Sequence, residues 1–180
     1  IILGSRAGKA LTTGIHNVAI GYAALRTEDT GDKNVAVGYA ALNALNYDGD
    51  GYNVAIGHSA GLSVTTGTNN TIIGGLAGDA LTTGYSNVAI GRNALSTEDT
   101  GRANTAVGYY ALATQNSDTA NYNTAVGYAA GQNVSTGIRN AIVGGNTATA
   151  LTTGSYNTVF GSHALLTEDT GSANTAIGYA

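Results

Sequence analysis

The residues best suited to chemistry are acidic pairs in a recurring segment, TEDT. The pairs are Glu28 and Asp29, Glu98 and Asp99, and Glu168 and Asp169. Neighbouring carboxylates could act as a general acid and a general base. We expect these pairs to lie on the polar side of an exposed turn, and we therefore predict no catalysis at them.

A second acidic segment, NYDGDGYN at residues 46–53, offers Asp48 and Asp50 as oxygen ligands for Ca²⁺. A later copy of this segment, QNSDTANYN at positions 115–123, keeps Asp118 but has Ala120 in place of the second acid. The pattern favours a turn-rich loop over a metal site. Asp48 and Asp50 stay as the one calcium hypothesis, and no other cofactor is predicted.

The histidines do not form a catalytic group. His16, His58 and His163 occupy three different positions of the repeat described below, and no Ser, His and acid recur together at a fixed spacing. We predict surface positions for all three and no enzymatic activity.

Composition excludes several classes of protein. The chain has no Cys, which removes disulfides, thiolate metal sites and cysteine nucleophiles. Its seven Lys and Arg residues are spread singly along a chain of net charge −4, which argues against nucleic acid as a partner. The sequence has no run of about 18 apolar residues, so no membrane insertion is predicted for this segment.

An asparagine opens each copy of a short repeat such as NVAIG. These asparagines are Asn17, Asn34, Asn53, Asn70, Asn87, Asn104, Asn123, Asn140, Asn157 and Asn174. The intervals between them run 17, 19, 17 and 17 and then start again, which gives a 70-residue super-repeat of four units. Such periodicity is typical of a stacked solenoid.

The side chains indicate which solenoid. The residue before the repeat's glycine, called the motif glycine below, is Ile or Val in most copies, which favours strands over helices. We therefore predict an all-β chain, a parallel β-solenoid or β-roll with 17- and 19-residue coils. Residues 1–180 would form one uncapped section of a longer rod, with blocks at 17–86, 87–156 and 157–180 and a partial block at 1–16.

Three further expectations concern the coil. The motif glycine should bend the chain between two short strands. Ala is nearly constant three residues after it and should be buried, whereas the residue directly after it varies and should face out. Large residues four and seven positions after the glycine tend to exclude each other, as in Leu25 with Glu28 and Gly61 with Val64, so these positions should share one volume.

Two columns carry polar or aromatic side chains. The repeated Asn predicts an amide ladder at a turn, with a simple turn-forming role as the alternative. One outward column contains Tyr22, Tyr39, Tyr109, Tyr128 and Tyr179. These rings could contact glycans or a partner surface, or could pack between subunits. Sequence does not separate these two interpretations.

One thin solenoid buries few large side chains per coil, so we expect parallel copies to pack side by side, most simply as a homotrimer. The small residues of the constant Ala columns would then let neighbouring chains approach closely.

The phrases NVAIGYAAL, TTGTNNTIIGGLAG and TGRANTAVGYYAL resemble two related groups of repeats. One is the Gly/Asn/Thr repeats of phage tail fibres and bacterial surface fibres that often end in an endosialidase-type chaperone. The other is the head of YadA-type trimeric autotransporter adhesins, a trimer of left-handed parallel β-rolls. The resemblance covers the whole chain and implies an extracellular, cell-surface or virion location.

We therefore expect a structural and adhesive segment of a fibre that spans distance and presents a multivalent surface to a host glycan or receptor. An enzyme-bearing tailspike that cleaves polysaccharide is one alternative. A monomeric solenoid that binds ice or carbohydrate is another. The TTG segments raise the ice-binding option, but adjacent Thr residues point to opposite sides of a strand.

Overall fold

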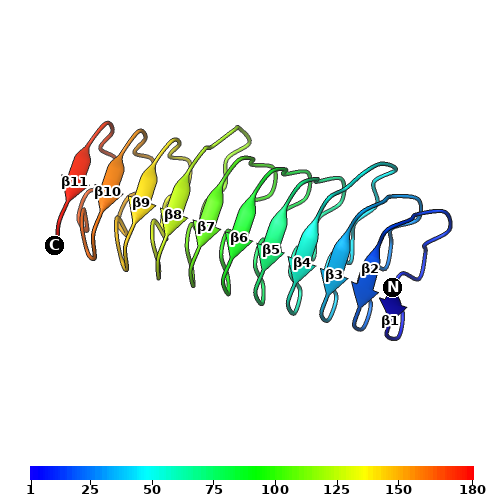
Figure 1. Cartoon of the computed structure of the whole chain (residues 1–180). Helices are drawn as coiled ribbons and strands as arrows, with labels where there is room; N and C mark the ends of the chain where they lie inside the picture. The colour runs from blue at the N-terminus through cyan, green and yellow to red at the C-terminus, as the bar shows by residue number, and fades with distance from the viewer.

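The computed structural model describes all 180 residues as one continuous series of stacked coils (Figure 1). Each coil contributes one strand to a single row. The strands are β1 (Ile2–Leu3), β2 (Val18–Ile20), β3 (Val35–Val37), β4 (Val54–Ile56), β5 (Thr71–Ile73), β6 (Val88–Ile90), β7 (Thr105–Val107), β8 (Thr124–Val126), β9 (Ala141–Val143), β10 (Thr158–Phe160) and β11 (Thr175–Ile177). The chain is therefore a β-solenoid, as the repeat predicts.

All eleven strands form one parallel sheet in chain order, β1 to β11. Each strand pairs with its equivalent in the next coil, so that Val18 pairs with Val35 and Val35 with Val54. This register places identical repeat positions above one another. The predicted parallel solenoid with 17- and 19-residue coils is confirmed.

The motif glycine bends the chain, but it does not join two strands. It directly follows the single strand of each coil, and its φ lies between 127° and 147° in all eleven copies, a region that L-residues rarely adopt. The residues after it form turns. The prediction of a second strand after the glycine is wrong, because the chain there passes through left-handed conformations that a strand does not contain.

Left-handed backbone recurs throughout the coil. Positive φ occurs at 27 non-glycine residues, mainly two and four positions after the motif glycine and directly before the repeat asparagine; Ala23, Leu25 and Lys33 are one such set. Each such residue costs roughly 1–2 kcal/mol relative to right-handed backbone. The coil keeps them because its turns must return the chain to the start of the next strand within a single short repeat.

Backbone hydrogen bonds connect the coils far beyond the strands. Of 100 backbone–backbone bonds, 19 lie within strands and 81 lie in turns and loops. In the turn after the motif glycine, for example, the Leu25 N–H donates to the Ala41 carbonyl 3.0 Å away in the next coil. The parallel ladder therefore continues around much of the coil and offsets the strain of the left-handed residues.

The interior is narrow and lined with alanine. In β2–β10 the middle residue is buried, and so is the Ala three positions after the motif glycine; Ala19 and Ala24 are both fully buried. These columns belong to one cluster of 28 buried residues. The prediction that the Ala column is buried is confirmed, and the expectation that it contacts other subunits is wrong, because a single chain already encloses it.

Three positions share the rest of the interior. Where the middle strand residue enlarges to Ile72, glycine stands four positions after the motif glycine in the same coil and in the preceding one. A Cβ on Gly61 would lie 3.0 Å from the Ile72 Cδ1 atom and 3.1 Å from a Leu42 methyl. The predicted sharing of volume holds, but it extends to the strand and to the adjacent coil.

The two 19-residue coils place their extra residues in loops before β4 and β8, which stand out from the row in Figure 1. Single bridges, Asp32 with Asp50 and Arg102 with Ala120, tie these loops to the preceding coil. The sheet register continues past both insertions.

Gly74 and Gly75 provide a matched test of the bend. Gly74 has a φ of 133° and a Cβ there would lie 2.6 Å from the Gly91 carbonyl carbon, whereas a Cβ on Gly75 meets nothing closer than 4.0 Å. We predict that Gly74→Ala lowers the free energy of unfolding by at least about 3 kcal/mol. Gly75→Ala should change it by less than about 0.5 kcal/mol.

Urea unfolding followed by circular dichroism measures both values. Equal effects of the two substitutions would show that the motif glycine does not set the coil spacing.

Candidate functional site

The repeat asparagines form a buried ladder along one corner of the coil. Each Asn side-chain oxygen accepts a hydrogen bond from the backbone N–H of the next asparagine, for example from Asn104 to Asn87 at 3.0 Å. In most coils the side-chain amide donates to a glycine carbonyl 14 residues further on, as from Asn87 to Gly101 at 2.8 Å. Direct amide-to-amide bonds occur at only three steps of the ladder. The main partner of each amide is therefore backbone.

The ladder changes beside the long coils. Asn34 donates to the carbonyl of Asp32, and the Asn104 amide nitrogen is buried without a partner. Both residues precede a 19-residue coil, where no glycine carbonyl lies at the usual position. The insertions therefore weaken one of the two bonds at these two steps.

Asn87 makes both bonds, so its truncation tests the ladder. In Asn87→Ala the backbone N–H of Asn104 and the carbonyl of Gly101 would stay buried without this partner, at about 1–3 kcal/mol each. We predict a loss of about 2–6 kcal/mol in the free energy of unfolding. The exposed Asn116, whose side chain makes no hydrogen bond, is the control, and Asn116→Ala should leave stability unchanged. A similar loss for both variants in urea unfolding would contradict the ladder.

The sequence predicted an exposed turn for the TEDT acids, and this is wrong for two of the three glutamates. Glu168 is partly exposed, and Asp29, Asp99 and Asp169 are partly or fully exposed. Glu28 and Glu98 are fully buried, and the inward direction of their column carries them inside. The Glu28 carboxylate accepts bonds from the N–H groups of Gly31 at 2.8 Å and Tyr47 at 3.2 Å. Glu98 accepts from the Gly101 N–H at 2.7 Å and the Asn121 amide at 2.8 Å. These carboxylates close turns, and nothing places them beside an open surface.

Burial raises the pKa of Glu98 above its usual range, and the backbone N–H of Gly101 opposes the shift. The folded chain therefore holds this proton more tightly than the unfolded chain. Stability is highest below the unfolded pKa of about 4.3 and falls as the pH rises through the folded pKa.

We predict that Glu98→Gln removes this decrease in stability with rising pH. The substituted amide fits the column, because Gln115 occupies the same repeat position fully buried. The buried, unpaired Oδ1 of Asn121 could accept from the new amide once Asn121 turns over. Melting temperatures of wild type and variant between pH 4 and 8 should diverge with rising pH, in favour of the variant. Parallel plots of melting temperature against pH for the two proteins would show that ionisation of Glu98 does not lower stability.

The acids of the calcium hypothesis have protein partners. Asp50 pairs with the Lys33 ammonium at 2.7 Å and accepts from the Tyr52 hydroxyl at 3.1 Å. The bond from Lys33 holds the pKa of Asp50 below its usual range, and the same pair raises the pKa of Lys33. Asp48 accepts from the Thr30 hydroxyl at 3.0 Å. No group of three or more His, Cys, Asp or Glu side chains is arranged to hold a metal ion.

The histidines lie on separate coils. His58 stacks on Tyr39 with ring centroids 4.9 Å apart, and its Nδ1 lies 3.1 Å from the Ser59 hydroxyl. His163 makes a similar contact with Ser162 at 2.8 Å. Each pair consists of sequence neighbours, and no carboxylate hydrogen-bonds to either ring. The third, His16, is exposed.

The outward tyrosine column forms short stacks. Tyr22 lies on Tyr39 at 5.3 Å with an interplanar angle of 12°, and Tyr109 lies on Tyr128 at 5.4 Å. Tyr179 leans on His163 in the last coil. Because the stacked rings cover one another's faces, the column offers mainly ring edges and hydroxyls to a ligand or partner.

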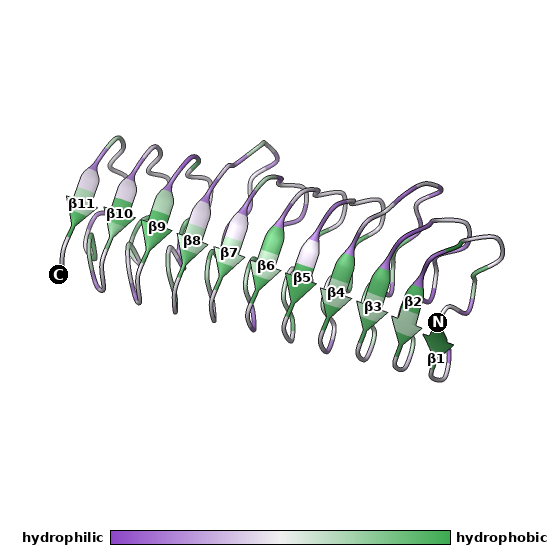
Figure 2. Ribbon diagram, in the orientation of Figure 1, coloured by the Kyte–Doolittle hydropathy of each residue, from purple (hydrophilic) through white to green (hydrophobic).

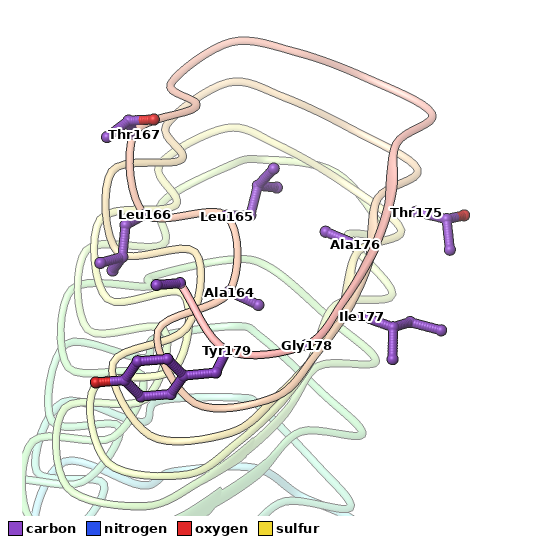
Figure 3. Close-up of a pocket in the computed structure, with 10 residues that line it drawn as sticks. Ala164, Leu165, Leu166, Thr167, Thr175, Ala176, Ile177, Gly178 and Tyr179 are labelled. Carbon is purple, nitrogen blue, oxygen red and sulfur yellow. The ribbon is translucent and has the colours of Figure 1, made fainter.

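The largest cavity, about 650 Å³, is the open cross-section of the coil at its C-terminal end (Figure 3). Leu165 and Ala176 point into it, whereas Thr175 and Ile177 point away from the coil. The cavity is thus the interior of the last coils, and it does not resemble a cleft between elements.

The fold and these contacts define a parallel β-solenoid repeat protein. No protein-family model, curated protein or solved structure matches the chain. The resemblance to phage fibre and adhesin repeats therefore stays a prediction. No helix is long and apolar enough to span a bilayer.

Proposed function

We propose that the chain is a structural and adhesive segment of an extracellular fibre, in which three parallel copies pack through one face of the sheet. The observation that supports this is an uncharged, largely β-branched surface that runs the length of the solenoid. We call it the outer strand face. It consists of the first and third residues of strands β2–β11.

The burial pattern of the strands defines this face. In β2 and β6 the middle residue is fully buried while the two flanking residues stay partly exposed. Figure 3 shows the same alternation in β11, where Ala176 points inward and Thr175 and Ile177 point out. The third residue is Ile, Val or Phe in every one of these strands, and Phe160 is 57% exposed.

The outer strand face carries no charge. Neither of its columns contains a charged residue or a proline in any coil. Figure 2 shows apolar colour in β3, β4, β6 and β9, and paler strands where Thr is the first residue, as in β5, β7 and β8. Contiguous apolar surface of this kind typically marks an interface. Packing against another copy would remove it from water.

The copy number of three comes from the resemblance to trimeric fibre repeats, as does the extracellular, cell-surface or virion location. Parallel alignment suits the face, because equivalent coils of each chain then meet at one level. Ten coils at about 4.8 Å give a section roughly 50 Å long.

Adhesion would arise from repetition. Weak contacts on several coils of three chains sum to avidity without any single strong site. A host glycan or receptor is the proposed partner, and the stacked tyrosine edges are part of the surface presented. A structural role is preferred over a tailspike enzyme, because the buried Glu28 and Glu98 are engaged by backbone and Asp50 by Lys33.

A monomeric ice- or carbohydrate-binding solenoid is the second candidate function. It is favoured by the same face, whose first column mixes Val with Thr in a regular row, as at Thr71, Thr105 and Thr124. Oligomeric state separates the two, because a trimer would cover the row that ice would need.

Ile90→Glu tests the trimer. Ile90 is the last residue of β6 and points out, so the carboxylate should leave the coil intact but would be desolvated between copies. We predict a mass of three chains for the wild type that persists on dilution, and a mass of one chain for the variant, by light scattering. Ser96→Glu, in a turn away from the outer strand face, should keep the wild-type mass. A wild type that is monomeric at all concentrations would overturn the assembly.

A further inference from the structure

Three of the chain's seven basic residues gather in one groove. Arg6, Lys9 and Arg26 line a shallow hollow of about 340 Å³ together with Ala10 and Thr27. The sequence conceals this cluster, because Lys9 and Arg26 belong to successive coils and become neighbours only when those coils stack. The expectation that the basic residues are spread singly is therefore wrong for this end of the solenoid.

The cluster has no counter-charge. The only ion pair in the chain joins Lys33 to Asp50, and no side-chain nitrogen of Arg6, Lys9 or Arg26 donates a hydrogen bond to protein. The acids of the nearest TEDT segment do not form ion pairs with these cations. Glu28 is buried against backbone N–H groups, and Asp29 accepts a hydrogen bond from the Thr30 N–H at 2.8 Å. Three like charges thus share one hollow of a chain whose net charge is −4.

The coil itself does not require these cations. One super-repeat further along the chain, the equivalent positions hold Leu76, Asp79 and Ser96, and the fold is the same there. In the super-repeat after that, the three positions hold Asn, Thr and Leu. A like-charge cluster that the fold does not need, and that only the first coils carry, points to a ligand that supplies negative charge.

A second hollow adjoins the first and shares Arg26. It measures about 330 Å³ and is lined by Tyr22, Tyr39, Asn43 and Ser59, among others. The Arg6 guanidinium lies 5.7 Å from the Tyr22 ring centroid, and Tyr39 covers the other face of that ring. The surface next to the cations is therefore made of ring edges, amides and hydroxyls, which suit a polyhydroxylated molecule better than an aromatic base that would need an open ring face.

The groove stays accessible in the proposed trimer. Lys9 and Arg26 stand five positions after their motif glycines, and Leu166 stands at the same position in the last complete turn. Figure 3 shows Leu166 on the side of the coil opposite to Thr175 and Ile177 of the outer strand face. Copies that pack through that face would leave the groove exposed.

We propose that Arg6, Lys9 and Arg26 form a binding site for an acidic saccharide, a sugar unit that carries a carboxylate or a sulfate. The guanidinium groups and the ammonium would bind the anionic group, and the adjoining tyrosine and amide edges would bind hydroxyls of the chain. This inference rests on the proposed adhesive function, because it names the class of ligand that the adhesive surface would bind.

The test is binding to immobilised oligosaccharides at physiological salt. The probes are a sulfated glycosaminoglycan oligomer, an oligogalacturonide as the carboxylate form, and neutral dextran of the same length. We expect one or both acidic probes to bind, dextran to bind far more weakly, and added salt to weaken the binding. The double variant Lys9→Gln/Arg26→Gln should weaken it at least about tenfold, the effect of losing one charged hydrogen bond.

The matched control is Arg92→Gln. Arg92 is also exposed and lies over a tyrosine ring, that of Tyr109, but stands apart from other cations, so this variant should bind as the wild type does. Equal binding by the double variant and the wild type would overturn the site. If inorganic sulfate competes at the same concentration as the oligomer, the groove binds an adventitious ion only, and the saccharide site is overturned. If a DNA duplex binds as tightly as the acidic oligosaccharides, the groove is a general polyanion surface, and specificity for saccharides is overturned.

Light scattering on the same samples keeps this inference separate from the proposed function. A monomer that binds acidic probes through Lys9 and Arg26 would support the groove and overturn the trimer. A trimer that binds none of them would overturn the groove alone.

Discussion

The contact on which the rest of the structure depends is that between the backbones of successive motif glycines. A Cβ on Gly74 would meet the peptide of Gly91 at 2.6 Å, and the same approach recurs from coil to coil. No side chain fits between coils at this corner, so backbone alone sets their separation. The Asn ladder fixes the opposite end of the strand, where Asn87 bonds to both Asn104 and Gly101. Between these two corners a three-residue strand is sufficient, since both of its ends are already held.

So close an approach has two consequences for the coil. The interior is too narrow for large residues at every position, and alanine fills most of it. The chain must also turn sharply, which it does through left-handed residues such as Ala23 and Leu25. Their conformational cost is offset by a ladder of backbone hydrogen bonds that continues through the turns. Strain and stabilisation are thus distributed evenly over the coils, and no single coil carries a dominant core.

The sequence predicts the parts of this structure that follow from periodicity. The asparagine spacing and the β-branched residues before the motif glycine are sufficient for a parallel solenoid and its register. Periodicity along one chain shows which positions are equivalent but not which way their side chains point. The near-constancy of the Ala column was enough to predict its burial, whereas the TEDT pattern did not reveal that Glu28 and Glu98 point inward and are buried. A small residue and a buried polar residue have the same spacing whichever way they point. The basic groove was missed for a related reason, since Lys9 and Arg26 become neighbours only across coils.

Different repeat positions fill the interior in different coils, and this limits how many coils the solenoid can gain or lose at once. Large side chains occupy the strand centre in one coil, as at Ile72, and the turn in another, as at Leu42, and each choice is matched by its neighbour, as Gly61 shows. Loss of a single coil would bring unmatched neighbours together and leave a clash or a void at the junction. Loss or gain of one whole super-repeat would restore every match. Unequal recombination in the gene should therefore be tolerated in units of four coils, so that the solenoid lengthens and shortens in steps of about 19 Å.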